Sequence, residues 1–254
     1  MSNCDTQLAN FEALGYARGI RVADSSAVVR YRQSFDELEQ REGRAKCQKG
    51  LFDLHFSVPF VWELASHPAI LDCVESLLGP DLLLMGSHFF CKYGPSEAFV
   101  AWHQDLTYWG LEPRLAVSAW YAVDDSDVGN GCMQVIPGSH RGGIRGHGKS
   151  SDPSANLLSI NQQLLVAEDE LRAVVNIELA AGEISLHHGL TIHGSPPNRS
   201  SRRRCGLAMI YLPTHVRQVR ENSLGTDWQT VLVRGENRHR NFNDHPWPFP
   251  AAIV

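Results

Sequence analysis

The feature that most limits the fold of this chain is a series of short β-rich runs that begins near residue 81. No long helical pattern separates them. Six runs have strand length: DLLLMGSHFFCKY, LAVSAWYAV, CMQVIP, VVNIEL, EISLHH and RCGLAMIYL. The stretches between them include GPSE, DVGNG, AAGE and GSPPNRSS, which have turn chemistry. Short strands without helical crossovers pair antiparallel, so the pattern predicts a mainly β sandwich or barrel.

The chain before residue 81 has a helical pattern instead. A first helix is expected to follow Asp5 and to end at Gly15, and a second to span about 26–41. The third lies in SHPAILDCVESLLGP, with Ser66 as its N-cap and a Gly-Pro pair as its stop. We therefore expect three helices to precede the β-rich part.

Length and charge limit the domain organisation and the partners. A chain of 254 residues is long enough for one sizeable domain, and we find no internal repeat or linker. The net charge is −5 with scattered Lys and Arg, which argues against nucleic acid as a partner. No apolar stretch approaches the ~20 residues that span a bilayer, so we expect no membrane insertion. The oligomeric state cannot be predicted from the sequence.

Cysteine usage and the N-terminus bear on location. The six cysteines are widely spaced and include no CxxC pair. The N-terminus lacks the charged and apolar regions of a secretion signal. Together these features favour reduced thiols in the cytoplasm.

The clearest chemical motif is WHQDLTYW, which contains His103 and Asp105. On an extended chain, residues two apart point to the same side, so these side chains can converge on one point. An imidazole and a carboxylate are complementary ligands for a divalent metal, and a third ligand is needed from another strand. His193 is the favoured candidate, while His187 and His188 compete for the role and are interpreted as hydrogen-bonded histidines of the core or rim.

An arginine follows the candidate metal ligands. Arg204 lies eleven residues after His193 in the next predicted strand, so a hairpin would return its guanidinium towards the metal. Arginine suits a carboxylate because it donates two parallel hydrogen bonds. A metal with open positions beside such a group predicts a chelating keto-diacid cosubstrate.

These motifs, with VSAWYAVDD, NGCMQVIPGSH and IHGSPPNRSSRRRCGLAMIY, resemble the phytanoyl-CoA dioxygenase (PhyH) family of Fe(II)/2-oxoglutarate oxygenases over roughly 50–215. The resemblance implies a double-stranded β-helix, a cupin-like jelly roll, buttressed by N-terminal helices. Within one domain, 1–254, it suggests a helical part of about 1–80, a core of about 81–215 and an extended C-terminal tail.

The resemblance also implies roles for single residues. His103, Asp105 and His193 would hold Fe(II), Arg204 would bind the distal carboxylate of 2-oxoglutarate, Ser195 would assist it, and Trp120 would lie near this cosubstrate. Arg202 shares the predicted face of Arg204 and stays an alternative for the carboxylate. Arg203 is expected to face the opposite side.

The implied function is an Fe(II)- and 2-oxoglutarate-dependent dioxygenase. We expect it to hydroxylate an unactivated C–H bond with O2 as oxidant and to release succinate and CO2. Basic residues of the polar loop 141–156 favour a small polar or anionic metabolite as substrate. They are Arg141, Arg145, His147 and Lys149. Lys92 could reach the site but is interpreted as a surface lysine.

Other interpretations stay open. Desaturation or cyclisation could occur at the same site. Two histidines and a carboxylate also suit the zinc of a metal-dependent hydrolase, although no HExxH motif supplies a base. A non-catalytic jelly-roll binding module with a degenerate site is the third alternative.

Overall fold

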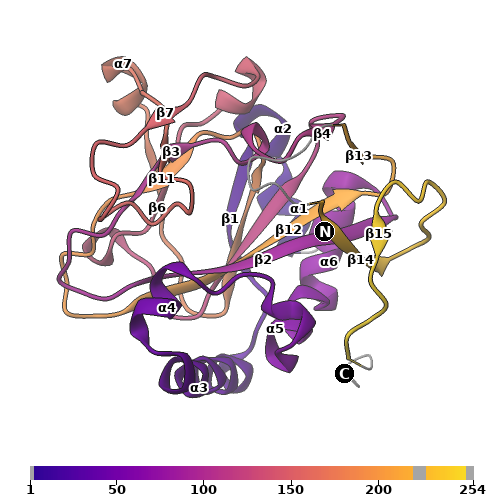
Figure 1. Cartoon of the computed structure of the whole chain (residues 1–254), viewed down its shortest axis with the longest axis horizontal. Helices are drawn as coiled ribbons and strands as arrows, with labels where there is room; N and C mark the ends of the chain where they lie inside the picture. Colours follow the sequence, from indigo (N-terminus) through magenta and orange to yellow (C-terminus); the bar gives the residue numbers. More distant parts are fainter. Residues whose placement is uncertain (1–2, 220–226, 250–254) are drawn as a thin grey trace.

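The computed structural model describes residues 3–219 and 227–249, and two antiparallel sheets form its centre (Figure 1). The larger sheet has seven strands in the order β1-β10-β5-β12-β2-β14-β15, and the smaller has four in the order β3-β11-β6-β9. The strand pairs are antiparallel except for β14 with β15. The predicted mainly β fold class is confirmed.

The strands are short, and each of the six predicted runs contains one. The larger sheet is built from β1 (Tyr16–Arg21), β2 (Leu82–Lys92), β5 (Val117–Ala122), β10 (Glu183–His188), β12 (Arg204–Pro213), β14 (Gln229–Arg234) and β15 (Asn243–Asp244). The smaller contains β3 (Val100–His103), β6 (Met133–Val135), β9 (Val175–Ile177) and β11 (His193–Ser195). Two further pairs are β4 (Leu111–Glu112) with β13 (Arg217–Gln218) and β7 (Gly148–Lys149) with β8 (Gln162–Gln163).

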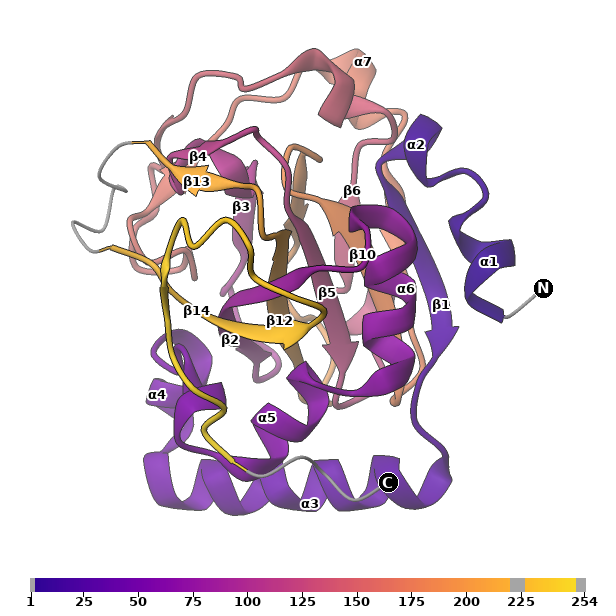
Figure 2. The ribbon, with the colours of Figure 1, turned by 90° about the vertical axis from the view of Figure 1, so that its right-hand side faces the viewer.

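Among the described residues, all α-helices except α7 precede β2, and they buttress the larger sheet, as predicted (Figure 2). They are α1 (Asn3–Leu8), α2 (Phe11–Leu14), α3 (Ser25–Glu42), α4 (Arg44–Lys49), α5 (Pro59–Ala65) and α6 (Pro68–Leu78), with α7 (Glu168–Leu171) later in the chain. One hydrophobic core joins α3, α5 and α6 to this sheet, with Phe35 and Trp62 among its largest side chains. Burial of these aromatic rings holds the helical layer on the sheet.

Two helix boundaries differ from the predictions. The first predicted helix is two short ones, because a new helical turn begins at Asn10, whose carbonyl accepts from the N–H of Leu14 at 2.9 Å. The N-cap of α6 is His67, whose ring accepts from the N–H of Ala69, and not Ser66. The hydroxyl of Ser66 instead donates to the carbonyl of Trp62 and ends α5.

Three strands of the larger sheet were not predicted: the two-residue β15 of the tail and the longer strands β1 and β14. β1 lies in the helical part at an edge of the sheet, and its register pairs Tyr16 with His187. β14 lies in the predicted tail and pairs with β2, with Val231 opposite Leu84. Both strands depend on an existing neighbour, because their own alternation of apolar residues is weak.

The expectation of reduced thiols is wrong for one pair of cysteines. Helix α1 packs near α6, so the Cα atoms of Cys4 and Cys73 lie 5.8 Å apart and a disulfide joins the two residues. Four cysteines are free and buried: Cys47, Cys91, Cys132 and Cys205. Across 3–219 and 227–249, no helix has the length and apolar character needed to cross a membrane.

Candidate active site

Two neighbouring strands of the smaller sheet bring the predicted metal ligands together. His103 ends β3 and His193 begins β11, and the two are opposite each other in the strand register. The extended backbone of Gln104 carries the chain to Asp105. Ligand atoms of His103, Asp105 and His193 all lie within 4.8 Å of one another.

Hydrogen bonds to the backbone orient both imidazoles. The Nδ1 of His103 lies 2.9 Å from the carbonyl of Ala101, and the Nδ1 of His193 lies 3.0 Å from the carbonyl of Thr191. A carbonyl only accepts, so each Nδ1 donates and each Nε2 keeps its lone pair. These Nε2 atoms lie 3.3 and 3.8 Å from Oδ1 of Asp105. This donor set fits a divalent iron ion bound on one face by two histidines and a carboxylate.

The protonation states also suit a metal. Burial acts to raise the pKa of Asp105, but the neighbouring imidazoles of His193 and His103 hold it well below its ordinary value. Burial lowers the pKa of His193 well below its ordinary value. The cluster therefore presents a carboxylate and neutral imidazole at neutral pH, which are the forms that bind metals.

Two further side chains face the carboxylate of Asp105. The hydroxyl of Ser118 donates to its Oδ2 at 2.9 Å. His187 has its Nε2 3.4 Å from the same oxygen and its ring 4.4 Å from that of His193. His187 is buried, as expected of a core histidine, and this long contact with Asp105 is the polar contact of its ring within the described residues. His188 does accept from the N–H of Leu190, as expected.

Arg204 lies inside the protein beside the metal cluster. Its side chain is 2% exposed, and its guanidinium lies 4.6 Å from the ring centroid of Trp120. It forms no salt bridge within the described residues, and its Nε contacts the hydroxyl of Ser126 at 3.4 Å. Burial lowers the pKa of Arg204 to about 10.

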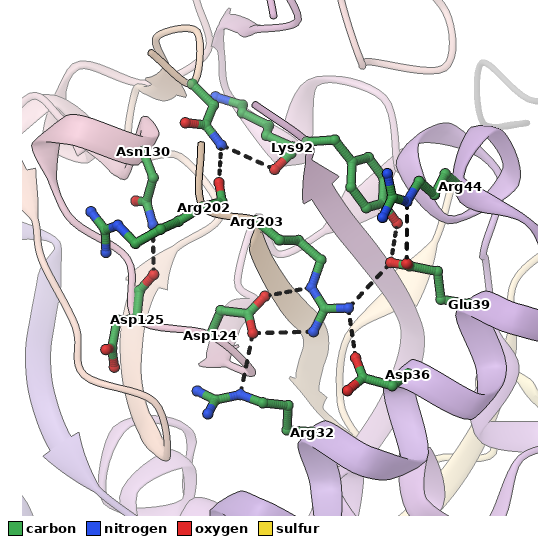
Figure 3. A network of polar contacts seen from close by, with 12 residues as sticks. Arg32, Asp36, Glu39, Arg44, Lys92, Asp124, Asp125, Asn130, Arg202 and Arg203 are labelled. Atoms are coloured by element: carbon green, nitrogen blue, oxygen red, sulfur yellow. Dashed lines mark hydrogen bonds and ion pairs between the residues drawn. The ribbon is translucent and has the colours of Figure 1, made fainter. Parts of the chain in front are cut away.

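The two arginines before Arg204 point elsewhere. Arg203 faces the helical layer, where it forms ion pairs with Asp124, Asp36 and Glu39 (Figure 3). Arg202 pairs with Asp127 at the surface. Both guanidinium groups therefore have carboxylate partners, whereas that of Arg204 has none among residues 3–219 and 227–249.

Lys92 lies behind the cavity and contacts it through Ser195, which lines the cavity. It is fully buried, opposite Arg204 in the register of β2 and β12. Its Nζ donates to the hydroxyl of Ser195 at 2.6 Å and to the carbonyl of Pro196. Burial, followed by the charge of Arg204, lowers the pKa of Lys92 well below its ordinary value. The prediction of a surface lysine is therefore wrong, and its position in a strand of buried residues was the available signal.

All six predicted site residues line one cavity of about 370 Å³. They are His103, Asp105, Trp120, His193, Ser195 and Arg204. The cavity is near the lower end of the range of ~300–1,000 Å³ for small-molecule sites. It is large enough for a small cosubstrate with a small substrate.

The loop 141–156 does not contribute its basic residues to this cavity. Arg145 pairs with Glu170, and His147 accepts from the backbone N–H of Gln104. Lys149 donates to the carbonyl of Ile160. The loop therefore gives no support to an anionic substrate.

Antiparallel sheets that hold two histidines and a carboxylate beside a buried arginine define the class of non-haem iron oxygenases. The chain belongs to the phytanoyl-CoA dioxygenase (PhyH) family, whose family model matches residues 11–206. The predicted membership is thereby confirmed.

Individual relatives agree with this family. Human peroxisomal phytanoyl-CoA dioxygenase is 31% identical over 139 residues, which are 52% of this chain and 40% of the relative. This chain thus matches about 40% of that relative's length. The non-heme monooxygenase ThoJ superposes with a TM-score of 0.76 at 28% identity, over 94% of this chain and 86% of that one. CytC3, solved with Fe(II) and alpha-ketoglutarate, shares the fold with a TM-score of 0.68 at 23% identity, over 94% and 92% of the two chains.

Proposed function

We propose that this protein is an Fe(II)- and 2-oxoglutarate-dependent dioxygenase that hydroxylates an unactivated C–H bond of a small polar metabolite. The observation that carries the proposal is one cavity that contains both the His103, Asp105 and His193 cluster and a buried arginine, Arg204, which has no carboxylate partner in the part of the chain that the structure describes. The Fe(II) and alpha-ketoglutarate named for the structural relative CytC3 agree with it.

The three clustered side chains would hold iron. Bound there, Fe(II) with 2-oxoglutarate and O2 supplies the oxidation, in which the keto acid leaves as succinate and CO2 and one oxygen atom enters the substrate. Ser118 would keep the carboxylate of Asp105 in place through its hydrogen bond. The two backbone carbonyls that accept from Nδ1 would fix the metal-binding tautomers of His103 and His193.

Arg204 would bind the distal carboxylate of 2-oxoglutarate, and Lys92 and Ser195 would assist it. Because Lys92 donates to the oxygen of Ser195, the proton of that hydroxyl is free to point at an incoming carboxylate. Trp120 would hold the guanidinium of Arg204 in position through its ring face. A dianionic ligand next to these cations would offset the cost of burying them.

The predictions about the domain, the partners and the location are proposals as well. We infer a single oxygenase domain that takes a small-molecule substrate, 2-oxoglutarate and O2. A cytoplasmic location stays a prediction, and the disulfide between Cys4 and Cys73 removes part of its basis.

The test is anaerobic addition of Fe(II) and 2-oxoglutarate to the purified protein. A weak visible charge-transfer band of an iron-chelated keto acid is expected, and succinate in place of 2-oxoglutarate should give none. Absence of the band, with zinc bound at one equivalent instead, would contradict the proposal and favour the hydrolase alternative.

A further inference from the structure

The cavity has a second end, away from the cosubstrate end at Arg204, because the N–H of Ser87 donates to Asp53 and Ser87 pairs with Met209, five residues along β12 from Arg204. Phe52 and Asp53 line it from a segment that lies beside β2, where Phe52 forms a β-bridge with His88. Trp109 and Trp228 line it from two other parts of the chain. These residues take no part in the roles proposed above, so they are available to select the primary substrate.

Asp53 is a partly buried acid, and the described residues supply no cationic partner for it. Its Oδ1 accepts from the backbone N–H of Ser87 at 3.0 Å, and its φ of 51° lies in the left-handed region. No Lys or Arg of the described chain forms a salt bridge with it, and its Oδ2 has no hydrogen bond there. Burial raises the pKa of Asp53. A carboxylate in this setting is stabilised by any cation that enters the cavity.

Aromatic side chains surround this end of the cavity. Phe52 stacks on the ring of His88 with centroids 4.0 Å apart. The indole N–H of Trp228 donates to the carbonyl of Trp109 at 3.2 Å, which fixes one ring against the other loop. Tyr108 also lines the cavity. Aromatic faces attract cations through their quadrupole.

The imidazole of His88 also lines the cavity, and it carries no charge that would repel a cation. Burial lowers the pKa of His88 to about 3, so this imidazole is neutral. Among the described residues, Arg204 is the lysine or arginine that lines the cavity, and it belongs to the cosubstrate end. The substrate end is therefore acidic and aromatic, whereas the cosubstrate end is basic.

We propose that the primary substrate carries a cationic nitrogen, such as a protonated amine, that Asp53 binds among Phe52, Trp109 and Trp228. The inference rests on the proposed function, because it assigns the part of the cavity that 2-oxoglutarate leaves free. The basic residues of loop 141–156 had suggested an anionic substrate, whereas this inference gives the substrate a positive charge.

The test compares head groups on matched carbon skeletons. The anaerobic complex with Fe(II) and 2-oxoglutarate is titrated with the amine, the alcohol and the carboxylic acid of the phenylethyl, indolylethyl and cyclohexylethyl series, and the shift of the visible band reports binding. We expect the amine of at least one series to bind about 10-fold to 100-fold more tightly than its alcohol and acid.

The Asp53→Asn variant tests the residue. An amide keeps an oxygen for the N–H of Ser87, and Asn tolerates a left-handed backbone, so the fold should be retained. This variant should lose the preference for the amine while binding the alcohol as before. Glu168→Gln removes an exposed carboxylate of α7 outside the cavity and should change neither.

Each outcome decides the inference. It is overturned if no amine binds more tightly than its alcohol and acid, or if the preference survives in Asp53→Asn. A failure of the band itself, before any probe is added, would count against the proposed function instead.

Discussion

Lys92 and Arg204 are two buried cations that lie opposite each other on neighbouring strands. Neither has a salt bridge in the described parts of the chain, and burial lowers the pKa of both groups. Isolated buried charges cost several kcal/mol each, so a protein that keeps them has a use for them. On the proposed function, the distal carboxylate of 2-oxoglutarate would offset the charge of Arg204, and Lys92 would act on it through Ser195.

Arg204→Ala should weaken 2-oxoglutarate binding strongly while iron binding stays close to normal. Removing one partner of a buried charge pair costs about 2–5 kcal/mol, which corresponds to an increase of roughly 30-fold to several-thousand-fold in the concentration needed. Titration of the visible band with 2-oxoglutarate measures this change. Arg202→Ala is the matched control, because its guanidinium pairs with Asp127 at the surface. An effect confined to Arg202→Ala would show that the carboxylate is bound by that residue.

Asp105→Ala should abolish substrate-coupled release of succinate, because the variant loses the anionic ligand of the cluster. Ser118→Ala keeps that carboxylate and removes one hydrogen bond to it, so a smaller loss of about 10-fold to 100-fold is expected. Succinate formation and iron binding, measured side by side, separate the two effects. Unchanged turnover in Asp105→Ala would refute its role as a ligand.

Part of the candidate site could be predicted from the sequence. The spacing of His103 and Asp105 is local, so alternation along an extended chain was enough. The predicted hairpin from His193 to Arg204 is wrong, because β11 pairs with β3 and β6 in the smaller sheet whereas β12 pairs with β2 and β5 in the larger one. Ser118 and Lys92 contact residues that lie far along the chain, at Asp105 and Ser195. Such contacts depend on the register of whole strands, which no local pattern gives.

At the scale of elements, β12 holds the site together because it pairs with both β2 and β5. Arg204 begins this strand, and Gly206 lies two residues later on the same side. A Cβ at Gly206 would come within 2.0 Å of the ring of Trp120. The missing side chain thus makes room for the ring that lies under the guanidinium.

Gly206→Ala should destabilise the protein and displace Trp120. Overpacking of a filled interior costs about 1–3 kcal/mol, so a lower thermal midpoint and weaker 2-oxoglutarate binding are expected together. Gly146→Ala, where nothing lies within 4 Å of the added carbon, is the control. A normal thermal midpoint in Gly206→Ala would mean that the strand shifts freely to admit the methyl group.

Elements with a strong pattern of their own were predicted well. α3 extends over Ser25–Glu42 against an expectation of about 26–41, and all six predicted β-rich runs contain a strand. β1 was missed because it buries only Ala17 and Ile20, with a glycine at residue 19. Its pairing with β10 supplies the order that its sequence lacks.

For the whole molecule, stability depends on how the helical layer meets the larger sheet. Arg203 lies in this contact and joins Asp124 of the sheet side to Asp36 of α3 (Figure 3). His55 lies in the same interior and is fully buried, with its Nδ1 2.9 Å from the hydroxyl of Ser87. Charging such a residue in acid opposes folding.

The free energy of unfolding should fall as the pH drops from about 6.5 towards 4. Burial, followed by the charge of His245, lowers the pKa of His55 from 6.5 to about 4. Between these values the unfolded chain binds more protons, so acid favours unfolding. His55 alone should account for about 2–3 kcal/mol between pH 7.5 and pH 4.5.

Urea unfolding of the wild type and of His55→Asn at several pH values measures this contribution. The amide keeps a polar partner for Ser87 but does not titrate, so the variant should show a shallower dependence on pH. Equal slopes for the two proteins would exclude His55 as a source of acid sensitivity.

Trp228 lies outside the part of the chain that matches the PhyH family model, whereas all six predicted site residues lie within residues 11–206. The ring nevertheless lines the same cavity, from the segment just before β14. On the inference above, one wall of the substrate end therefore comes from a segment beyond the range that the family model matches, whereas the metal ligands lie within it. On this proposal, substitutions in the segment before β14 would alter which molecule the cavity accepts and leave the three metal-binding side chains untouched.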